Sequence, residues 1–175
     1  MRRRALSPDD SKRSGDCTND ETAHVKRLLV VHHTVSPATH AVHLAVMAGA
    51  QDPAIQGVEV LARPALTASA VEVMEADGYL LGGPVNLGYL AGALKHFFDQ
   101  IYYPCLEATQ GRPFAVYLHS NQDATGALRA LESITGGLKW RQAQAPLIVK
   151  GEPSPQDLDA ARELGASVAA GLVLD

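Results

Sequence analysis

Three hydroxyl side chains stand between an apolar run and a helical pattern early in the chain. Thr34, Ser36 and Thr39 follow the apolar residues 28–31, and residues 39–50 have the pattern of a helix. A helix N-terminus carries unpaired backbone N–H groups and about half a positive charge, so it attracts phosphate. Serine and threonine also cap helices without any ligand. The segment therefore indicates a phosphate site or a helix cap, and the residues alone favour neither.

Two further loops carry small or polar side chains directly after predicted strands. The apolar run 79–81 leads into residues 84–89, and the run 114–118 leads into residues 119–123. In open α/β sheets, ligands bind beyond the carboxyl ends of the strands. If the strand order is 2-1-3-4-5, both loops meet the hydroxyl segment at one edge. There His119 would hydrogen-bond a ligand or substrate carbonyl, or simply cap its strand.

The other histidines give a weaker signal. His40 and His43 lie three residues apart on a predicted helix and would suit zinc, but no acidic or cysteine partner stands near them. We therefore interpret them as surface or polar-face side chains and assign no metal. No Ser-His-Asp or Cys-His arrangement has a persuasive spacing, and residues 34–36 lack the glycine and lysine of a P-loop.

Strand and helix patterns alternate along the chain, which is typical of a parallel sheet with right-handed crossovers and helices on both faces. Gly82, Gly83 and Pro84 are expected to end the third strand. The strands are expected at 28–31, 57–61, 79–81, 114–118 and 146–149, and the helices at 39–50, 69–75, 90–104, 125–138 and from 154 onward. We predict an α/β three-layer sandwich around a five-stranded parallel sheet.

Length and composition set the remaining bounds. The 175 residues suit one domain over 26–175, preceded by a polar tail over 1–25 that is expected to be disordered. A net charge of -4 argues against a dedicated nucleic-acid binder. No apolar run is long enough to span a bilayer, and no apolar segment follows the basic Arg2–Arg4 run. With Cys17 and Cys105 as the two cysteines, a disulfide framework is not expected, and the cytoplasm is the expected location.

The segment from Gly83 to Gln100 resembles the flavodoxin-like superfamily, in particular its NAD(P)H-dependent FMN reductase and quinone oxidoreductase branch. It matches that branch's pattern G-x-P-x-x-x-G-x-x-x-G-x-x-K-x-F-x-D-Q closely, and the hydroxyl segment is similar to the superfamily's FMN phosphate loop. The resemblance covers nearly everything after the tail. It implies bound FMN, NAD(P)H as co-substrate, a quinone or other small electron acceptor, and a homodimer.

The resemblance also implies a set of FMN-binding residues. Thr34, Ser36, Ala38 and Thr39 would hold the phosphate. Pro84, Val85, Asn86, Leu87, Gly88 and Tyr89 would line one side of the isoalloxazine, and His119, Ser120, Asn121, Gln122 and Asp123 the other. Gly88 and Gly92 would permit close approach of the helix start to the sheet and cofactor, although Gly92 equally suits plain helix–sheet packing.

One residue departs from the family pattern. Flavodoxin-type phosphate loops usually carry glycine where Pro37 stands, and proline has no backbone N–H to donate. Two alternatives therefore remain beside the reductase. One is an FMN-binding electron carrier that accepts electrons only from a partner protein, and the other is a binding module of the same fold that has lost FMN.

Overall fold

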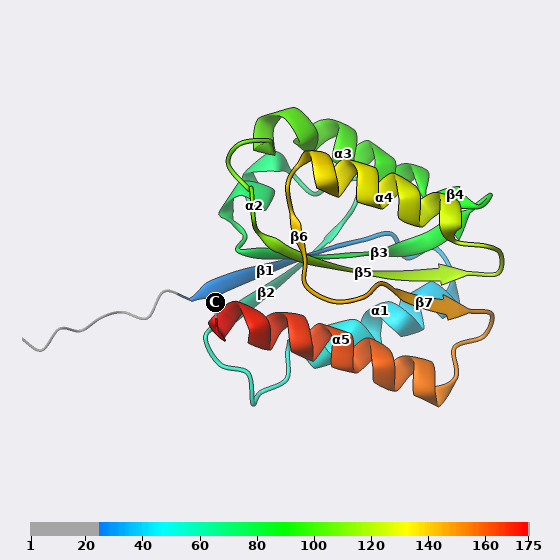
Figure 1. Ribbon diagram of the computed structural model, residues 1–175. Helices are drawn as coiled ribbons and strands as arrows, with labels where there is room; N and C mark the ends of the chain where they lie inside the picture. The colour runs from blue at the N-terminus through cyan, green and yellow to red at the C-terminus, as the bar shows by residue number, and fades with distance from the viewer. Residues whose placement is uncertain (1–24, 175) are drawn as a thin grey trace, which may run out of the picture.

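The computed structural model describes residues 25–174, so the tail predicted over residues 1–25, including Cys17 and the Arg2–Arg4 run, lies outside the described residues apart from Val25. Strands and helices alternate as the sequence predicts (Figure 1). In chain order they are β1 (Lys26–His32), α1 (Pro37–Ala50), β2 (Val58–Pro64), α2 (Ala70–Glu75), β3 (Gly78–Asn86), β4 (Tyr89–Leu90), α3 (Gly92–Cys105), β5 (Pro113–Ser120), α4 (Thr125–Gly137), β6 (Arg141–Gln142), β7 (Leu147–Lys150) and α5 (Pro155–Leu174).

The sheet has seven strands rather than the predicted five. Its order is β2-β1-β3-β5-β6, with β4 paired to β3 and β7 paired to β5. The four long strands are mutually parallel, in the relative order that we predicted. The last position is shared, because β6 pairs with the start of β5 at Pro113–Phe114 and β7 pairs with its end at Tyr117–Ser120. The predicted order 2-1-3-4-5 is therefore right only in outline.

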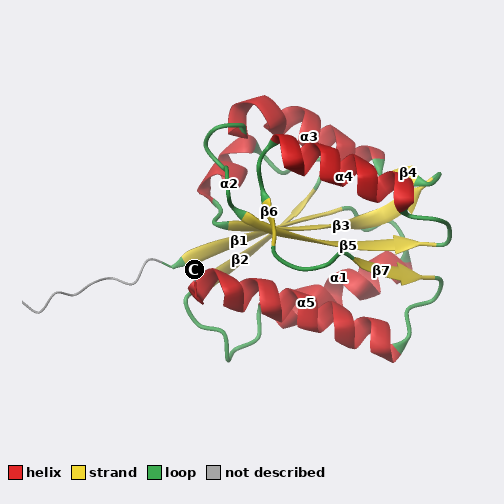
Figure 2. Ribbon diagram, in the orientation of Figure 1, coloured by secondary structure: helices red, strands yellow, loops and turns green. Residues whose placement is uncertain are grey.

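Helices cover both faces of the sheet, as Figure 2 shows: α2, α3 and α4 lie on one face, and α1 and α5 lie on the other. Each face buries its own apolar core. Tyr79, Phe97 and Trp140 belong to the first core, whereas Leu80, Val46 and Val168 belong to the second. Tyr79 and Leu80 are neighbours on β3, so the alternation of a strand sends its side chains to opposite cores. No helix within residues 25–174 has the length and apolar character needed to cross a membrane.

Strand β3 does not end at the glycines, so the expected strand end at Gly82–Pro84 is wrong. β1 pairs with β3 only as far as Gly82, whereas β5 pairs with it as far as Pro84. Pro84 thus has a neighbouring strand on one side only, the position at which a sheet tolerates proline. Gly82 is required for packing, since a Cβ there would lie 1.8 Å from Cζ of Tyr117.

Candidate functional site

The carboxyl ends of β1, β3 and β5 surround one hollow of about 280 Å³. It lies at the right-hand edge of the sheet in Figure 1, where the β3–β4 hairpin and the β5–α4 loop project. Its lining comes from all three segments that the sequence singled out: Val35, Ser36, Pro84, Val85, Asn86, Leu87, His119, Ser120, Asn121 and Gln122. The structure therefore brings the hydroxyl segment together with the two strand-end loops.

The hydroxyl segment forms a helix cap in this structure. Ser36 is the N-cap of α1, and its Oγ accepts from the backbone N–H of Thr39 at 3.2 Å. In return, Thr39 Oγ1 accepts from the backbone N–H of Ser36 at 3.0 Å, which completes a capping box. Pro37 occupies the first helical turn, where its missing N–H costs nothing to the helix. The helix start is thus already well ordered.

One hydroxyl proton in this cap remains available to a ligand. Thr39 Oγ1 donates its proton to the carbonyl oxygen of Ser36 at 2.9 Å. A hydroxyl has one proton to give, so Thr39 has none for a phosphate. Ser36 Oγ lies 3.1 Å from Thr39 Oγ1 and can turn its proton toward the hollow, which it lines. Thr34, Ala38 and Thr39 do not line the hollow; Thr34 and Thr39 line a smaller enclosed space with Gly83, Tyr117 and His119.

The β3–β4 hairpin forms the second wall. Leu87 and Gly88 both have positive φ, 53° and 73°, as the two central residues of a tight hairpin turn require. Leu87 at its tip is 97% exposed. Gly88 packs against the start of α4, where a Cβ on Gly126 would lie 2.4 Å from the Gly88 carbonyl oxygen. Gly92 has open space around it, so the close helix–sheet packing expected there is wrong; the close backbone approach lies at Gly126, against the hairpin.

The β5–α4 loop forms the third wall, and its polar side chains are engaged locally. His119 Nε2 donates to the Gly151 carbonyl oxygen at 2.7 Å. Ser120 Oγ donates to the Gln122 carbonyl and accepts from the Gln122 N–H. Asp123 turns away and accepts from the hydroxyl of Thr125 at the start of α4. Of this segment, His119 to Gln122 line the hollow.

Sequence reasoning missed a column of polar side chains, partly or fully buried, that adjoins the hydroxyl segment. His32 at the end of β1 stacks on His43 of α1, with ring centroids 4.1 Å apart. His43 Nδ1 is hydrogen-bonded to the Tyr117 hydroxyl of β5 at 2.8 Å, and His32 Nδ1 lies 3.3 Å from Thr34 Oγ1. His43 is only 7% exposed, so its assignment to a surface or polar face is wrong. Its place between Val42 and Val46 was the available signal.

Burial controls the ionisation of the column. Burial, with smaller contributions from His32 and His40, lowers the pKa of His43 to about 4. Burial and the neighbouring His33 and His40 also lower the pKa of His32. Burial alone raises the pKa of Tyr117. Both histidines of the stack are therefore neutral near pH 7. No group of three or more His, Cys, Asp or Glu side chains within residues 25–174 is arranged to hold a metal ion.

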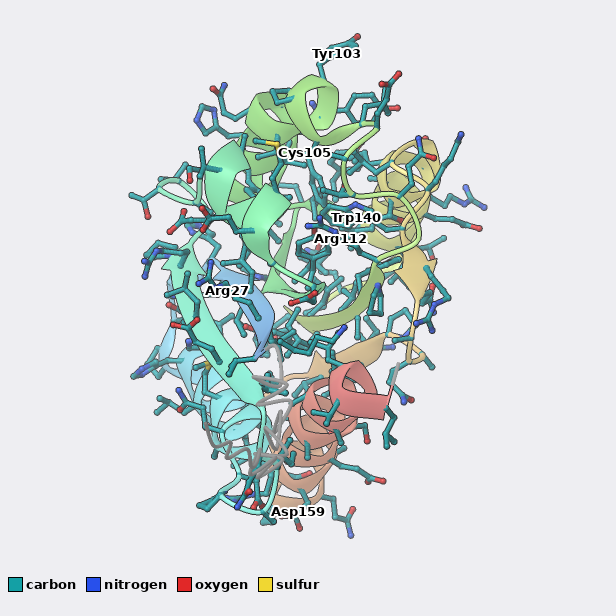
Figure 3. All side chains as sticks on the ribbon, turned by 90° about the vertical axis from the view of Figure 1, so that its left-hand side faces the viewer. Arg27, Tyr103, Cys105, Arg112, Trp140 and Asp159 are labelled. Atoms are coloured by element: carbon teal, nitrogen blue, oxygen red, sulfur yellow. The ribbon has the colours of Figure 1, made fainter. Side chains whose placement is uncertain are left out.

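Figure 3 views the molecule from the opposite side, where the strands begin. Two arginines there, Arg27 and Arg112, form contacts within the protein. Arg112 donates to the carbonyls of Val73 and Met74 at 2.9 and 2.8 Å and thereby holds the end of α2. Arg27 forms ion pairs with Glu59 and Glu75 at 3.0 and 2.8 Å. These contacts explain both arginines without a ligand.

The structure is similar to solved flavodoxins over most of the chain. A flavodoxin, WrbA-like protein from Agrobacterium tumefaciens is 23% identical, with 84% of this chain and 97% of that chain covered and a TM-score of 0.69. A flavodoxin from the domain Archaea is 17% identical, with coverages of 83% and 98% and a TM-score of 0.71. An oxidoreductase from Corynebacterium diphtheriae is 16% identical, with coverages of 86% and 98% and a TM-score of 0.66.

The comparisons of sequence give no further relative. No protein-family model matches the chain, and no curated protein matches it. The fold is therefore assigned from the similarity to these solved structures, from the parallel long strands and from the helices on both faces of the sheet. The protein has the flavodoxin-like fold that its sequence resemblance implied.

Proposed function

We propose that the protein is an FMN-binding oxidoreductase that takes a hydride from NAD(P)H and passes electrons to a quinone or another small acceptor. The observation that carries this proposal is the hollow at the carboxyl ends of β1, β3 and β5, lined by the three segments that resemble FMN-binding segments. That edge is where open α/β sheets bind their ligands. The similar structures named above are described as flavodoxins and an oxidoreductase, which supports the same class.

The residues present fit the phosphate end of FMN. Ser36 has a hydroxyl proton to offer, and Thr34 lines a small enclosed space that shares His119 with the hollow. Ala38 carries one of the first backbone N–H groups of α1, which have no partner within a helix. The dipole of this 14-residue helix adds positive potential at the same place. Pro37 removes one N–H from the set, so these groups have to hold the phosphate without it.

The other two walls fit the flavin ring. Val35 is 61% exposed and Leu87 is 97% exposed, and both line the hollow. A flat aromatic ligand between the hairpin and the β5–α4 loop would cover these apolar side chains and keep water from its face. Backbone and amide groups at Asn86 and Asn121 are available to its polar edge. When bound, the flavin supplies the redox chemistry, and these residues orient it.

Exchanging Ser36 for alanine tests the phosphate assignment. We expect Ser36→Ala to weaken FMN binding about tenfold to a hundredfold, because a hydrogen bond to a charged group contributes about 1.5–3 kcal/mol. The variant also loses about 1 kcal/mol of stability with its cap. Ser69→Ala is the matched control, since Ser69 forms the same capping box on α2 and does not line the hollow. Fluorescence titration with FMN measures both, and equal affinities would contradict the assignment.

A steady-state assay tests the enzymatic part of the proposal. The protein is loaded with FMN and mixed with NADH or NADPH and a benzoquinone. We expect consumption of NAD(P)H that rises with protein and acceptor concentration. Bound FMN that dithionite reduces but NAD(P)H does not would identify an electron carrier instead. A protein that retains no FMN would identify a binding module of the same fold.

The proposal includes a homodimer, as the resemblance implies. Leu66 in the turn before α2, and Val71 and Met74 on α2, are exposed apolar side chains that a second subunit could cover. Light scattering of the purified protein tests this state, and a monomeric mass at micromolar concentration would exclude it.

A further inference from the structure

The chain around the hydroxyl segment contains histidines but no lysine or arginine. No lysine or arginine occurs between Arg27 and Arg63, whereas four histidines lie at His32, His33, His40 and His43. The described residues that line the hollow include no lysine or arginine either. Within this segment and this lining, the side chains that can become positively charged are therefore imidazoles. These carry a charge only when they take up a proton.

His32 is the imidazole with a direct link to the segment. Its Nδ1 lies 3.3 Å from Thr34 Oγ1, and the two atoms can share a proton in either sense. If Nδ1 is bare, it accepts the hydroxyl proton of Thr34, which then has none for a ligand. If Nδ1 carries a proton, it donates to Oγ1, and the Thr34 hydroxyl has to point its own proton elsewhere. A positively charged His32 always carries a proton on Nδ1, so protonation of the ring leaves the Thr34 hydroxyl free to donate to a phosphate.

The surroundings of His32 hold its ring in place. The ring stacks on His43, which Tyr117 fixes through its hydroxyl. The titratable groups that face the ring are His33 beside it and His40 and His43 on α1, with Tyr117 of β5 beyond His43. The adjoining strands pair Pro64 of β2 and Gly82 of β3 with His32, and neither can ionise. Arg63 is already paired with Glu72, and α5 turns apolar side chains such as Ala161 and Leu164 toward this core.

We propose that binding of the FMN phosphate is coupled to proton uptake at His32, which positions the Thr34 hydroxyl as a phosphate donor and supplies a positive charge. This inference rests on the proposed function. Its sign follows from linkage. In the free protein His32 is neutral near pH 7, since its pKa lies below the ordinary value of 6.5. A bound dianion raises that pKa, so affinity increases as pH falls from about 8 toward the free-state pKa.

Two measurements on the unaltered protein test the coupling. FMN titrations at about pH 8 and about pH 6.5 are expected to differ by about tenfold, with tighter binding at the lower pH. Calorimetric titrations in two buffers with different ionisation enthalpies are expected to show net uptake of up to about one proton. Riboflavin, which has no phosphate, is expected to show neither effect.

A variant of His32 distinguishes the effect of its protonation from the effect of a hydrogen-bond donor at the same position. His32→Asn places a permanent amide donor near the position of Nδ1, so it is expected to bind FMN with no proton uptake. The second ionisation of the phosphate itself lies near pH 6, and this variant reports any effect from that source. His40→Gln, on the exposed face of α1, is the matched control and is expected to keep the pH dependence.

The outcomes distinguish the two proposals. FMN binding with no proton uptake in the unaltered protein, or with equal uptake in His32→Asn, overturns the role of His32 and leaves the proposed function intact. Failure to bind FMN at any pH overturns both. Uptake that is lost in His32→Asn and kept in His40→Gln supports the inference.

Discussion

Replacing Gly165 with alanine is expected to destabilise the protein by about 3 kcal/mol, the upper end of the usual cost of overpacking a core. Gly165 lies in the middle of α5, where the helix packs directly on α1. A Cβ at this position would lie 2.1 Å from the Val46 carbonyl oxygen and 2.9 Å from the Ala50 backbone nitrogen. Both are backbone atoms, so no side chain can turn aside. The two helices would have to separate, which would open the core beneath them.

The same helix offers a matched control for this substitution. Gly171, six residues further along α5, has no atom within 4 Å of its Cβ position. Gly171→Ala should therefore raise stability by about 0.5–1 kcal/mol, because alanine is the better helix former. Urea denaturation followed by circular dichroism compares the two variants. If Gly165→Ala is as stable as Gly171→Ala, the close α1–α5 packing described above is wrong.

Acid is expected to destabilise the protein through His43 well before its carboxylates are protonated. The pKa of His43 is about 4 in the folded protein and 6.5 in an ordinary environment. Between about pH 6.5 and about pH 4, His43 therefore binds a proton in the unfolded chain but not in the folded protein. Stability falls as pH decreases from about 6.5 to about 4, and the loss levels off once the folded state is protonated too. At about 1.4 kcal/mol for each pH unit, the loss amounts to about 3 kcal/mol.

A variant isolates this contribution from that of the carboxylates. His43→Asn retains a polar group near Nδ1 that can bond Tyr117, but it cannot ionise in this range. Its free energy of unfolding should be lower than that of the unaltered protein at pH 7, because the stacking with His32 is lost. Between about pH 6.5 and about pH 4, however, it should fall by about 3 kcal/mol less. Parallel pH dependences in the two proteins would contradict the buried, neutral state of His43.

The alternation of strands and helices could be predicted from the sequence because it depends on local apolar periodicity. Both predicted helices bury an apolar stripe, from Leu94 to Ile101 in α3 and from Ala161 to Leu172 in α5. Ser154, at which that helix was expected to begin, caps α5 together with Asp157. The short strands β4 and β6 escaped prediction, since a two-residue strand has no periodicity to detect.

The extension of β3 and the buried histidines depend on contacts that are distant in the chain. From the sequence, Gly82 is expected to end the strand. In the structure it leaves room for the ring of Tyr117, which lies 35 residues later in the chain. The sequence suggests that His43 is a surface residue, because its partners, His32 on β1 and Tyr117 on β5, are brought to it only by the fold. The three segments that line the hollow were found because each combines small, hydroxyl or amide side chains with the end of a strand. Their meeting in one hollow required the sheet order, which only the resemblance provided.

The measurement that tests the central proposal most directly is an absorbance spectrum of the purified protein after incubation with FMN and removal of the excess. We predict flavin bands in nearly one-to-one ratio with protein, and saturable quenching of FMN fluorescence when the same protein is titrated. Retention by the unaltered protein and weakened retention by Ser36→Ala would support the site at the N-terminus of α1. A colourless protein that shows no saturable binding of added FMN would contradict the proposed function.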